Sequence, residues 1–238
     1  MNYLLTVFLI GFVIFFHELG HFIAAKYAKI PIKIFSIGFG PKLWSVTKGI
    51  TEYRISLIPI GGYVLPDIED EREFFDLPVM SRLIMSAGGP LASFLLPTIC
   101  FSVLLTYNYG FSVAYLIIQP IQQVYMIAMN MLTSIPKLFS HTGQLSGVVG
   151  IVAQGSSFIK NDLTRTIQFI ALLSLNLGVL NLMPIPVLDG GKMILYLLEK
   201  IHPKFLRLHY PLVVVGWVFV LGLMIYVTAL DITRILIV

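Results

Sequence analysis

Three polar residues stand inside the apolar N-terminal stretch of the sequence. His17 and His21 are four residues apart, so on an α-helix both imidazoles lie on one face and can bind one metal ion. Glu18 follows His17 directly and can reach a water molecule held by that metal. Zinc lowers the pKa of a bound water towards about 7, and a glutamate can then move its proton to a leaving group. This spacing predicts hydrolytic chemistry.

The alternative interpretation of this motif is a pair of packing histidines beside a chance glutamate. Residues 3–25 are apolar apart from these three side chains. Ionisable groups inside a membrane span carry a large free-energy cost and mark functional sites, whereas in a soluble helix the alternative would be serious. The sequence around the motif therefore favours a metal site.

The composition is typical of an integral membrane protein. Of the 238 residues, 57% are hydrophobic and 12% are charged, whereas roughly a quarter of a soluble domain is charged. Spans of about 20 residues each leave room only for short connections, so we expect one membrane-embedded domain over residues 1–238. The net charge of +4 comes from scattered basic residues and does not indicate nucleic-acid binding. Cys100 is the one cysteine, so a Cys-based metal site is excluded.

Four apolar runs are long enough to cross the roughly 30 Å hydrocarbon core of a bilayer. They cover residues 3–25, 83–106, 166–188 and 211–230. The first has no basic flank or cleavage site before it, so we expect a retained span and not a signal peptide. Of the 16 Lys and Arg residues, eight lie between Lys26 and Arg82 and four between Lys192 and Arg207. By the positive-inside rule these connections face the cytoplasm and both termini lie outside.

A fifth apolar stretch, residues 111–135, is interrupted by several polar residues. If it crossed the membrane, Asp189 would emerge on the opposite side from His21. We therefore expect residues 111–140 to form an amphipathic helix that lies on or dips into the outer face.

A catalytic metal needs a third protein ligand, and Asp189 is the best candidate. At 1.5 Å per residue, His17 lies about 22 Å along its helix, in the cytoplasmic half of the membrane where Asp189 also falls. Asp189 also precedes Gly190 and Gly191, where it could instead be the N-cap of a helix over residues 190–201. The competing ligands, which we interpret as ordinary loop histidines, are His141, His202 and His209.

Two prolines, Pro184 and Pro186, are expected to break the third helix just before Asp189. Backbone groups freed at membrane depth are tolerated only where they face protein or a wet cavity, and hydrolysis needs water. Asn181, about one turn before, could bind a substrate backbone or could satisfy a freed carbonyl. The residues alone leave both roles open.

With H-E-L-G-H at residues 17–21 and N-x-x-P-x-P-x-L-D-G at residues 181–190, the chain resembles the site-2 protease family of intramembrane zinc metalloproteases. The resemblance is closest to the bacterial regulator-of-sigma-E protease (RseP) branch and runs almost end to end. The two motifs, in order and in separate spans, make it specific. The further stretches that carry it are GFGPKLW (38–44), TEYRISLIPIGGYV (51–64), AGGPLASF (87–94), SGVVGIV (146–152) and NLGVLN (176–181).

The resemblance implies that His17, His21 and Asp189 bind one Zn²⁺ ion, that Glu18 is the catalytic acid/base and that Asn181 contacts the substrate. It implies a multi-pass protein of the bacterial inner membrane, with its active site towards the cytoplasm. The substrates would be single-span membrane proteins such as an anti-sigma factor or a signal-peptide remnant. A catalytically silent scaffold and a zinc transporter remain as alternatives.

Residues 50–64 look like the re-entrant β-structure of this family, which pairs with an unwound substrate. The alternating pattern of the residues and the closing glycines allow an edge strand, and the alternative is an ordinary cytoplasmic hairpin. The residues expected to contact the substrate there are Tyr53, Ile55, Leu57, Gly61 and Gly62.

The RseP branch carries PDZ domains between its second and third spans. Here residues 107–165 are largely an apolar helix and a Gly-rich stretch, so we expect no PDZ domain. Substrate access would then be gated by a partner, by the 111–140 helix or by substrate size. The expected fold is a polytopic α-helical membrane protein with four transmembrane helices, a small re-entrant β-structure and an outer-face amphipathic helix.

Overall fold

Four long apolar helices form the framework of the protein. The computed structural model describes residues 2–68, 71–140 and 146–237, so His141 lies outside the described residues. The four helices are α1 (Asn2–Tyr27), α3 (Val79–Tyr109), α6 (Leu163–Asn181) and α8 (Leu206–Ile237). Over the described parts of the chain, these four are long and apolar enough to cross a membrane. The structure therefore has a helix at each of the four predicted spans, as expected for a multi-pass membrane protein.

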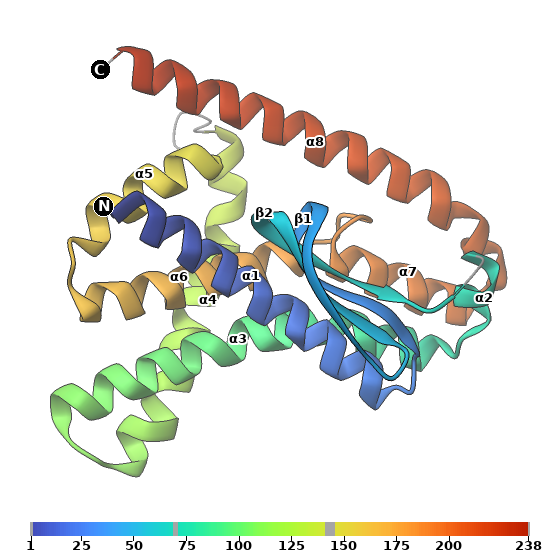
Figure 1. The fold of residues 1–238 in the computed structure, drawn as a ribbon, viewed down its shortest axis with the longest axis horizontal. Coiled ribbons are helices and arrows are strands. Elements are labelled where there is room, and N and C mark those ends of the chain that lie inside the picture. The colour runs from blue at the N-terminus through green and yellow to red at the C-terminus, as the bar shows by residue number, and fades with distance from the viewer. Residues whose placement is uncertain (1, 69–70, 141–145, 238) are drawn as a thin grey trace.

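Helices α1 and α3 pack closely side by side (Figure 1). At their crossing, a Cβ atom on Gly20 would overlap the carbonyl of Gly88, and a Cβ atom on Gly88 would overlap the carbonyl of Gly20. Only glycine at both positions lets the two backbones approach this closely. The contact holds the His/Glu motif of α1 directly against α3.

The main apolar core lies where α6 and α4 (Gln119–Ser140) join this pair. Its buried members come from α1, α3, α4 and α6, so these helices are packed as one bundle and not as independent hydrophobic rods. They are Val13, Leu96, Cys100, Phe101, Leu104, Val124, Ala171 and Leu175.

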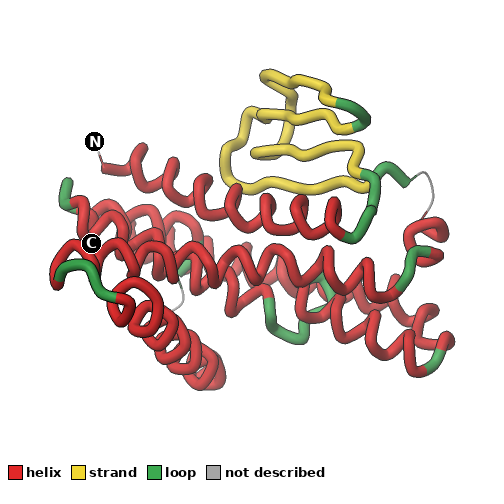
Figure 2. The backbone as a smooth tube through the Cα atoms, turned by 90° about the horizontal axis from the view of Figure 1, so that it is seen from below, coloured by secondary structure: helices red, strands yellow, loops and turns green. Residues whose placement is uncertain are grey.

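Beside the second half of α1 lies a twisted antiparallel β-structure (Figure 2). Its strands are β1 (Ile32–Lys48) and β2 (Thr51–Pro66), and each is long enough to bend back across the other. Phe35, for example, pairs with Tyr53 and also with Val64. The order across the sheet is therefore residues 62–66, 32–37, 52–55 and 42–48, with the last part of β2 at an edge.

The β-structure is larger than the sequence predicted. The sequence predicted β-structure at residues 50–64, whereas the structure adds β1, which contains Gly38, Gly40 and Pro41. Both glycines have positive φ angles, 87° and 84°, a backbone conformation that bends the strand and that other residues rarely adopt. These two glycines thus form the bend in β1.

The connections between the spans are also mostly helical. Residues Ala114–Ile118 form a π-helical turn that continues into α4, which runs across the direction of the spans (Figure 1). The predicted 111–140 helix is therefore present from Ala114, and its place at the outer face stays a prediction. The third span was expected to reach residue 188, but α6 ends at Asn181 because the following residues turn before the prolines. The shorter helices are α2 (Glu71–Asp76), α5 (Val148–Ile159), α7 (Asp189–Ile201) and a 3₁₀ turn at Pro203–Phe205.

Of the four spans, α8 has the smallest share of its residues buried inside the protein. Near its start, the His209 ring stacks on Tyr196 with centroids 5.6 Å apart and meets the edge of Phe75 at 4.8 Å. Near its end, Asp231 is 2% exposed, and its carboxylate accepts hydrogen bonds of 2.8 Å from the backbone N–H groups of Gly147 and Gly150. This carboxylate caps the N-terminus of α5 from a different helix. Specific polar and aromatic contacts thus hold α8 at its two ends.

Replacing Asp231 with alanine is expected to release the end of α8 from α5. Two backbone N–H groups lose their acceptor, and removal of a helix cap costs about 1–2 kcal/mol. Hydrogen exchange of the protein in detergent should rise over residues 224–237 and 147–152, while α1 and α3 stay protected. Thr233→Ala is the matched control, because the Thr233 hydroxyl bonds only within α8. Equal exchange in the two variants would contradict the role of Asp231.

Candidate metal centre

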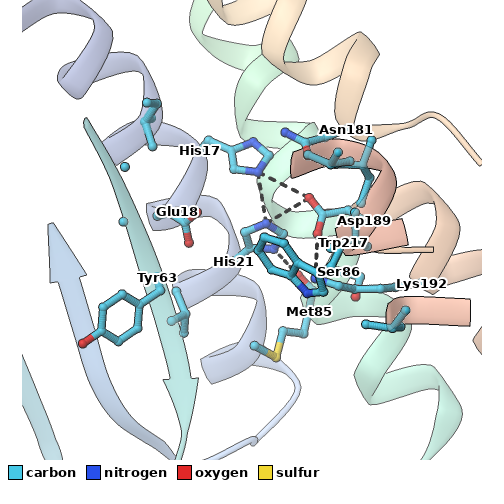
Figure 3. A pocket seen from close by; sticks show the side chains of 18 of the residues that line it. His17, Glu18, His21, Tyr63, Met85, Ser86, Asn181, Asp189, Lys192 and Trp217 are labelled. Carbon is cyan, nitrogen blue, oxygen red and sulfur yellow. Dashed lines mark hydrogen bonds and ion pairs between the residues drawn. The ribbon is translucent and has the colours of Figure 1, made fainter. Parts of the chain in front are cut away.

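Three of the predicted site residues meet at one point between α1 and α7 (Figure 3). His17 and His21 lie on one face of α1, with their Nε2 atoms 3.2 Å apart. Asp189, the first residue of α7, places its Oδ2 atom 3.3 Å from Nε2 of His17 and 3.2 Å from Nε2 of His21. All three residues are buried, at 5%, 9% and 6% exposure.

The triangle formed by these atoms has the size of a zinc ligand set. Ligands held at about 2.0–2.1 Å in a tetrahedral arrangement lie about 3.3–3.4 Å from one another. The observed separations of 3.2, 3.2 and 3.3 Å match this spacing. Two imidazole nitrogens and one carboxylate oxygen also form one of the usual three-ligand sets of a catalytic zinc, which leaves a fourth position for water or substrate.

The outer ring nitrogens of the two histidines are fixed by α3. Nδ1 of His21 lies 2.8 Å from the backbone carbonyl of Met85, which can only accept, so the proton belongs on Nδ1 and Nε2 keeps its lone pair for the metal. Nδ1 of His17 lies 2.8 Å from the Ser93 hydroxyl. The Ser93 carbonyl in turn accepts from Ser174 on α6. Three helices therefore orient the two rings.

The turn between α6 and α7 places Asp189. Residues 182–188 are non-helical, and the N-cap position of α7 is Leu188, which makes no side-chain cap hydrogen bond. A Cβ atom on Gly190 would overlap the Leu182 carbonyl, and one on Gly191 would overlap that of Ile185, so α7 starts packed against this turn. Asp189 is therefore not the N-cap of α7, the alternative role that the sequence left open. Its side chain faces the histidines.

A buried ion pair anchors the other end of α7. The guanidinium of Arg82 on α3 is 1% exposed and makes two hydrogen bonds, of 2.7 and 2.8 Å, to the Glu199 carboxylate. It also lies 4.9 Å from the centre of the Tyr196 ring. Burial raises the pKa of Tyr196 to about 12, so this phenol stays neutral. The ion pair fixes α7 against α3, which is the helix that already holds both histidine rings.

The three-residue cluster opens into a cavity of about 770 Å³. Its walls include residues of α1, the edge of β2, α3, α6, α7 and α8. Glu18 faces it beside β2, so closely that a Cβ atom on Gly62 would lie 2.9 Å from the Glu18 Cγ atom. Glu18 is thus next to the cluster and open to the same space.

The fold brings three of the six residues expected to contact substrate to the cavity. Asn181, Gly61 and Gly62 line the cavity, at the end of α6 and on the edge of β2. The other three, Tyr53, Ile55 and Leu57, do not line it. Tyr53 packs against the rings of Phe22 and Phe35, and the part of β2 that carries it pairs with a strand on both sides. Only the last part of β2 offers a free edge to the cavity.

Several lining residues were not singled out from the sequence. Tyr63 and Trp217 carry no motif that marks them, whereas Lys192 stands three residues after Asp189, the spacing that puts two side chains on one helix face. Of the competing histidines in the described residues, His209 lines the cavity but is engaged with Tyr196, and His202 is exposed.

Together these features define a class: a multi-pass membrane protein with a buried His-His-Asp cluster that could hold a metal ion, and an adjacent glutamate. Residues 5–224 match the family model of Peptidase family M50. The chain therefore belongs to peptidase family M50, and the resemblance drawn from its two motifs is confirmed at the level of the family.

Three relatives illustrate the range of similarity. A Campylobacter jejuni protein whose name describes a zinc metalloprotease is 24% identical over 99% of this chain and 94% of its own length. One from Clostridium perfringens, named likewise, is 25% identical over 91% of this chain and 94% of its own. One from Fusobacterium nucleatum is 42% identical over 101 residues, and the match spans 30% of that relative's length. The similarity to the first two thus extends over nearly the whole chain.

Gly89→Ala is expected to weaken metal binding. A Cβ atom at this position of α3 would overlap Nε2 of His21 and lie 2.7 Å from Cε1 of His17. Displaced ligand rings typically lower metal affinity about 10- to 100-fold, which competition with a fluorescent zinc chelator can measure. Gly222→Ala is the matched control, because its Cβ would meet no atom within 4 Å. Equal zinc affinity in the two variants, with both folded by circular dichroism, would contradict the site.

Proposed function

We propose that this protein is an intramembrane zinc endopeptidase that hydrolyses a peptide bond in or near the transmembrane helix of single-span membrane proteins. The observation that carries the proposal is the meeting of His17, His21 and Asp189 with Glu18 at one cavity between apolar helices. Buried ionisable groups of this kind are rare inside a membrane protein unless they serve a reaction or a transport path. Membership of peptidase family M50 favours the reaction.

The residues of the chain divide the work of hydrolysis between binding and proton transfer. His17, His21 and Asp189 would hold a zinc ion, which supplies Lewis acidity for the scissile carbonyl and lowers the pKa of a water molecule. Glu18 takes a proton as the water oxygen bonds to the carbonyl carbon. When the carbon–nitrogen bond breaks, its electron pair goes to nitrogen and Glu18 returns the proton there. The absence of a side chain at Gly62 leaves room for Glu18 beside the cavity.

The free edge of β2 is the proposed binding site for the substrate backbone. Residues 61–64 line the cavity beside Glu18, and no strand among the described residues pairs with their outer edge. An extended peptide can add to such an edge through main-chain hydrogen bonds, which do not demand a particular sequence. Asn181, from the end of α6, can donate its side-chain amide to the same peptide.

The proposed orientation puts the site towards the cytoplasmic side of a bacterial inner membrane, with both termini outside. Most Lys and Arg residues lie in the two connections at the ends of the spans nearest to the site, which supports this orientation. Anti-sigma factors and remnant signal peptides are the substrates that suit it. Their transmembrane helices would enter the cavity from the lipid.

Substrate access is proposed to be gated without a PDZ domain. The alignment with the Campylobacter jejuni relative runs over 347 positions against a chain of 238 residues, so the relative has more than a hundred positions with no counterpart here. A gating partner, α4 or the size of the substrate would then decide which proteins reach the cavity.

Glu18→Gln is expected to stop proteolysis while metal binding persists. The amide keeps the size of the side chain but cannot take a proton, so cleavage of a single-span model substrate should fall about 10²- to 10⁴-fold. Asp189→Asn should instead lose zinc, because the cluster loses its anionic ligand. The measurement is gel-resolved cleavage and zinc content per chain for purified protein in detergent. Cleavage that survives Glu18→Gln or complete zinc removal would sink the proposal, and one zinc per chain with no turnover would favour a silent scaffold.

Cleavage is expected to depend on how easily the substrate helix unwinds. A helix satisfies its own backbone hydrogen bonds, so its peptide cannot pair with β2 until it opens locally. Replacing a Gly or Pro near the cleaved bond of a model substrate with Leu should slow turnover, since Gly and Pro cost about 1 and 3 kcal/mol in a helix interior. The same replacement placed two turns outside the cleaved region serves as control. Equal rates for both substrates would contradict pairing by an unwound segment.

A further inference from the structure

The cavity contains a single cationic side chain of the Lys or Arg type. Among the described residues that line it, only Lys192 is basic apart from histidines, and much of the lining is apolar, with Val187, Val213, Trp217 and Val220 among its members. The lysine side chain is 38% exposed and extends from α7 towards Asp189 (Figure 3). An ammonium group among apolar side chains is unfavourable unless an anionic group compensates it.

The distances show that the Asp189 carboxylate compensates this charge only in part. Nζ of Lys192 lies 3.7 Å from Oδ1 of Asp189, which is within ion-pair range but too long for a hydrogen bond. Oδ2, the other oxygen of the same carboxylate, is the atom that faces the two histidines. In the described part of the chain, Nζ donates no hydrogen bond. The three N–H groups of Nζ are therefore available to a ligand. The Asp189 carboxylate lies between them and the proposed zinc position.

Lys192 and Glu18 approach this position from different sides. Glu18 lines the cavity from α1, next to β2, whereas Lys192 lines it from α7 (Figure 3). A substrate peptide on the edge of β2 would thus lie beside Glu18, the proton acceptor. The ammonium group of Lys192 would lie on the far side of the metal ligands. The other polar groups nearby, such as the Asn181 amide and the Tyr196 phenol, are neutral and cannot supply a positive charge.

We propose that Lys192 is a further catalytic residue, whose ammonium group binds the carbonyl oxygen of the scissile peptide as that oxygen becomes negative. This inference rests on the proposed proteolysis. When the water oxygen bonds to the carbonyl carbon, the π electron pair moves to the carbonyl oxygen, and Glu18 holds the proton from water. Lys192 donates a hydrogen bond to the oxygen without transferring a proton. As the carbon–nitrogen bond breaks, the carbonyl re-forms and Glu18 protonates the nitrogen, so Lys192 ends unchanged.

A purely structural role for Lys192 predicts a different result. If its charge only orients the Asp189 carboxylate, its removal should weaken zinc binding, and the protein that still holds zinc should turn over normally. If Lys192 binds the developing oxyanion, zinc affinity should be preserved and the chemical step should slow. Removal of one such donor typically lowers kcat about 10²- to 10³-fold.

The test compares Lys192→Met, Lys192→Arg and wild-type protein, purified in detergent and loaded with zinc. Methionine keeps the length of the side chain without its charge, and arginine restores a charged donor. The measurements are kcat and KM on a model single-span substrate, zinc affinity by chelator competition, and affinity for a phosphinic peptide, which carries a tetrahedral anion in place of the scissile amide. Lys200→Met, an exposed lysine on the same helix, is the matched charge control.

For Lys192→Met, kcat and phosphinic-peptide affinity should each fall about 10²-fold, while KM and zinc affinity stay within the range of Lys200→Met. Lys192→Arg should recover part of both losses. Wild-type kcat and inhibitor affinity in Lys192→Met, or lost zinc affinity with normal turnover of the zinc-bound fraction, would overturn the role of Lys192 and leave the proposed proteolysis standing. A wild-type protein that cleaves no substrate would overturn both.

Discussion

The contact of one carboxylate with two histidine rings is the interaction on which the rest of the structure depends. Oδ2 of Asp189 lies 3.2–3.3 Å from both Nε2 atoms, and all three side chains are buried. A buried carboxylate is stable only with partners, and a metal ion or the two rings can supply them. Because α1 carries the rings and α7 carries the carboxylate, these two helices must keep fixed positions relative to each other, and both pack against α3. The glycine crossing of α1 and α3 and the ion pair of Arg82 with Glu199 do this from both sides.

The remaining elements contribute to the site in different ways. Helices α1, α3 and α6 share one apolar core and orient the metal ligands, so their relative positions are tightly determined. The β-structure and α8 complete the walls of the cavity, to which α1, α3, α6 and α7 also contribute. Helix α8 is held by the stacking of His209 at one end and by the Asp231 cap at the other. Contacts from several helices therefore hold the two histidine rings, whereas α8 is the span with the smallest buried share.

Much of the framework could be predicted from the sequence, for identifiable reasons. The four spans follow from length and hydropathy, and the shared face of His17 and His21 follows from helical spacing. Depth in the membrane, together with the expectation that residues 111–135 do not cross it, favoured Asp189 as their partner, although an N-cap role stayed open. The β-structure could not be predicted well, because β1 contains Gly38 and Gly40 at its bend and because pairing across a folded-back strand is a tertiary property. For the same reason the free edge lies at residues 61–64 and not at Tyr53. The helix after Asp189 was predicted over residues 190–201, close to the observed α7, but the packing of Gly190 and Gly191 against the preceding turn, which places the Asp189 side chain, is a tertiary contact that sequence patterns do not reveal.

The central claim is that side chains from two separate helices form one tetrahedral zinc site at membrane depth. X-ray absorption spectroscopy at the zinc edge tests it most directly, on the purified protein in detergent. The account predicts nitrogen and oxygen ligands at about 2.0–2.1 Å, outer-shell scattering from two imidazoles and no sulfur ligand. It also predicts that Asp189→Asn removes or alters this spectrum. A six-coordinate shell of oxygen atoms, a single imidazole, or a spectrum unchanged by Asp189→Asn would contradict it.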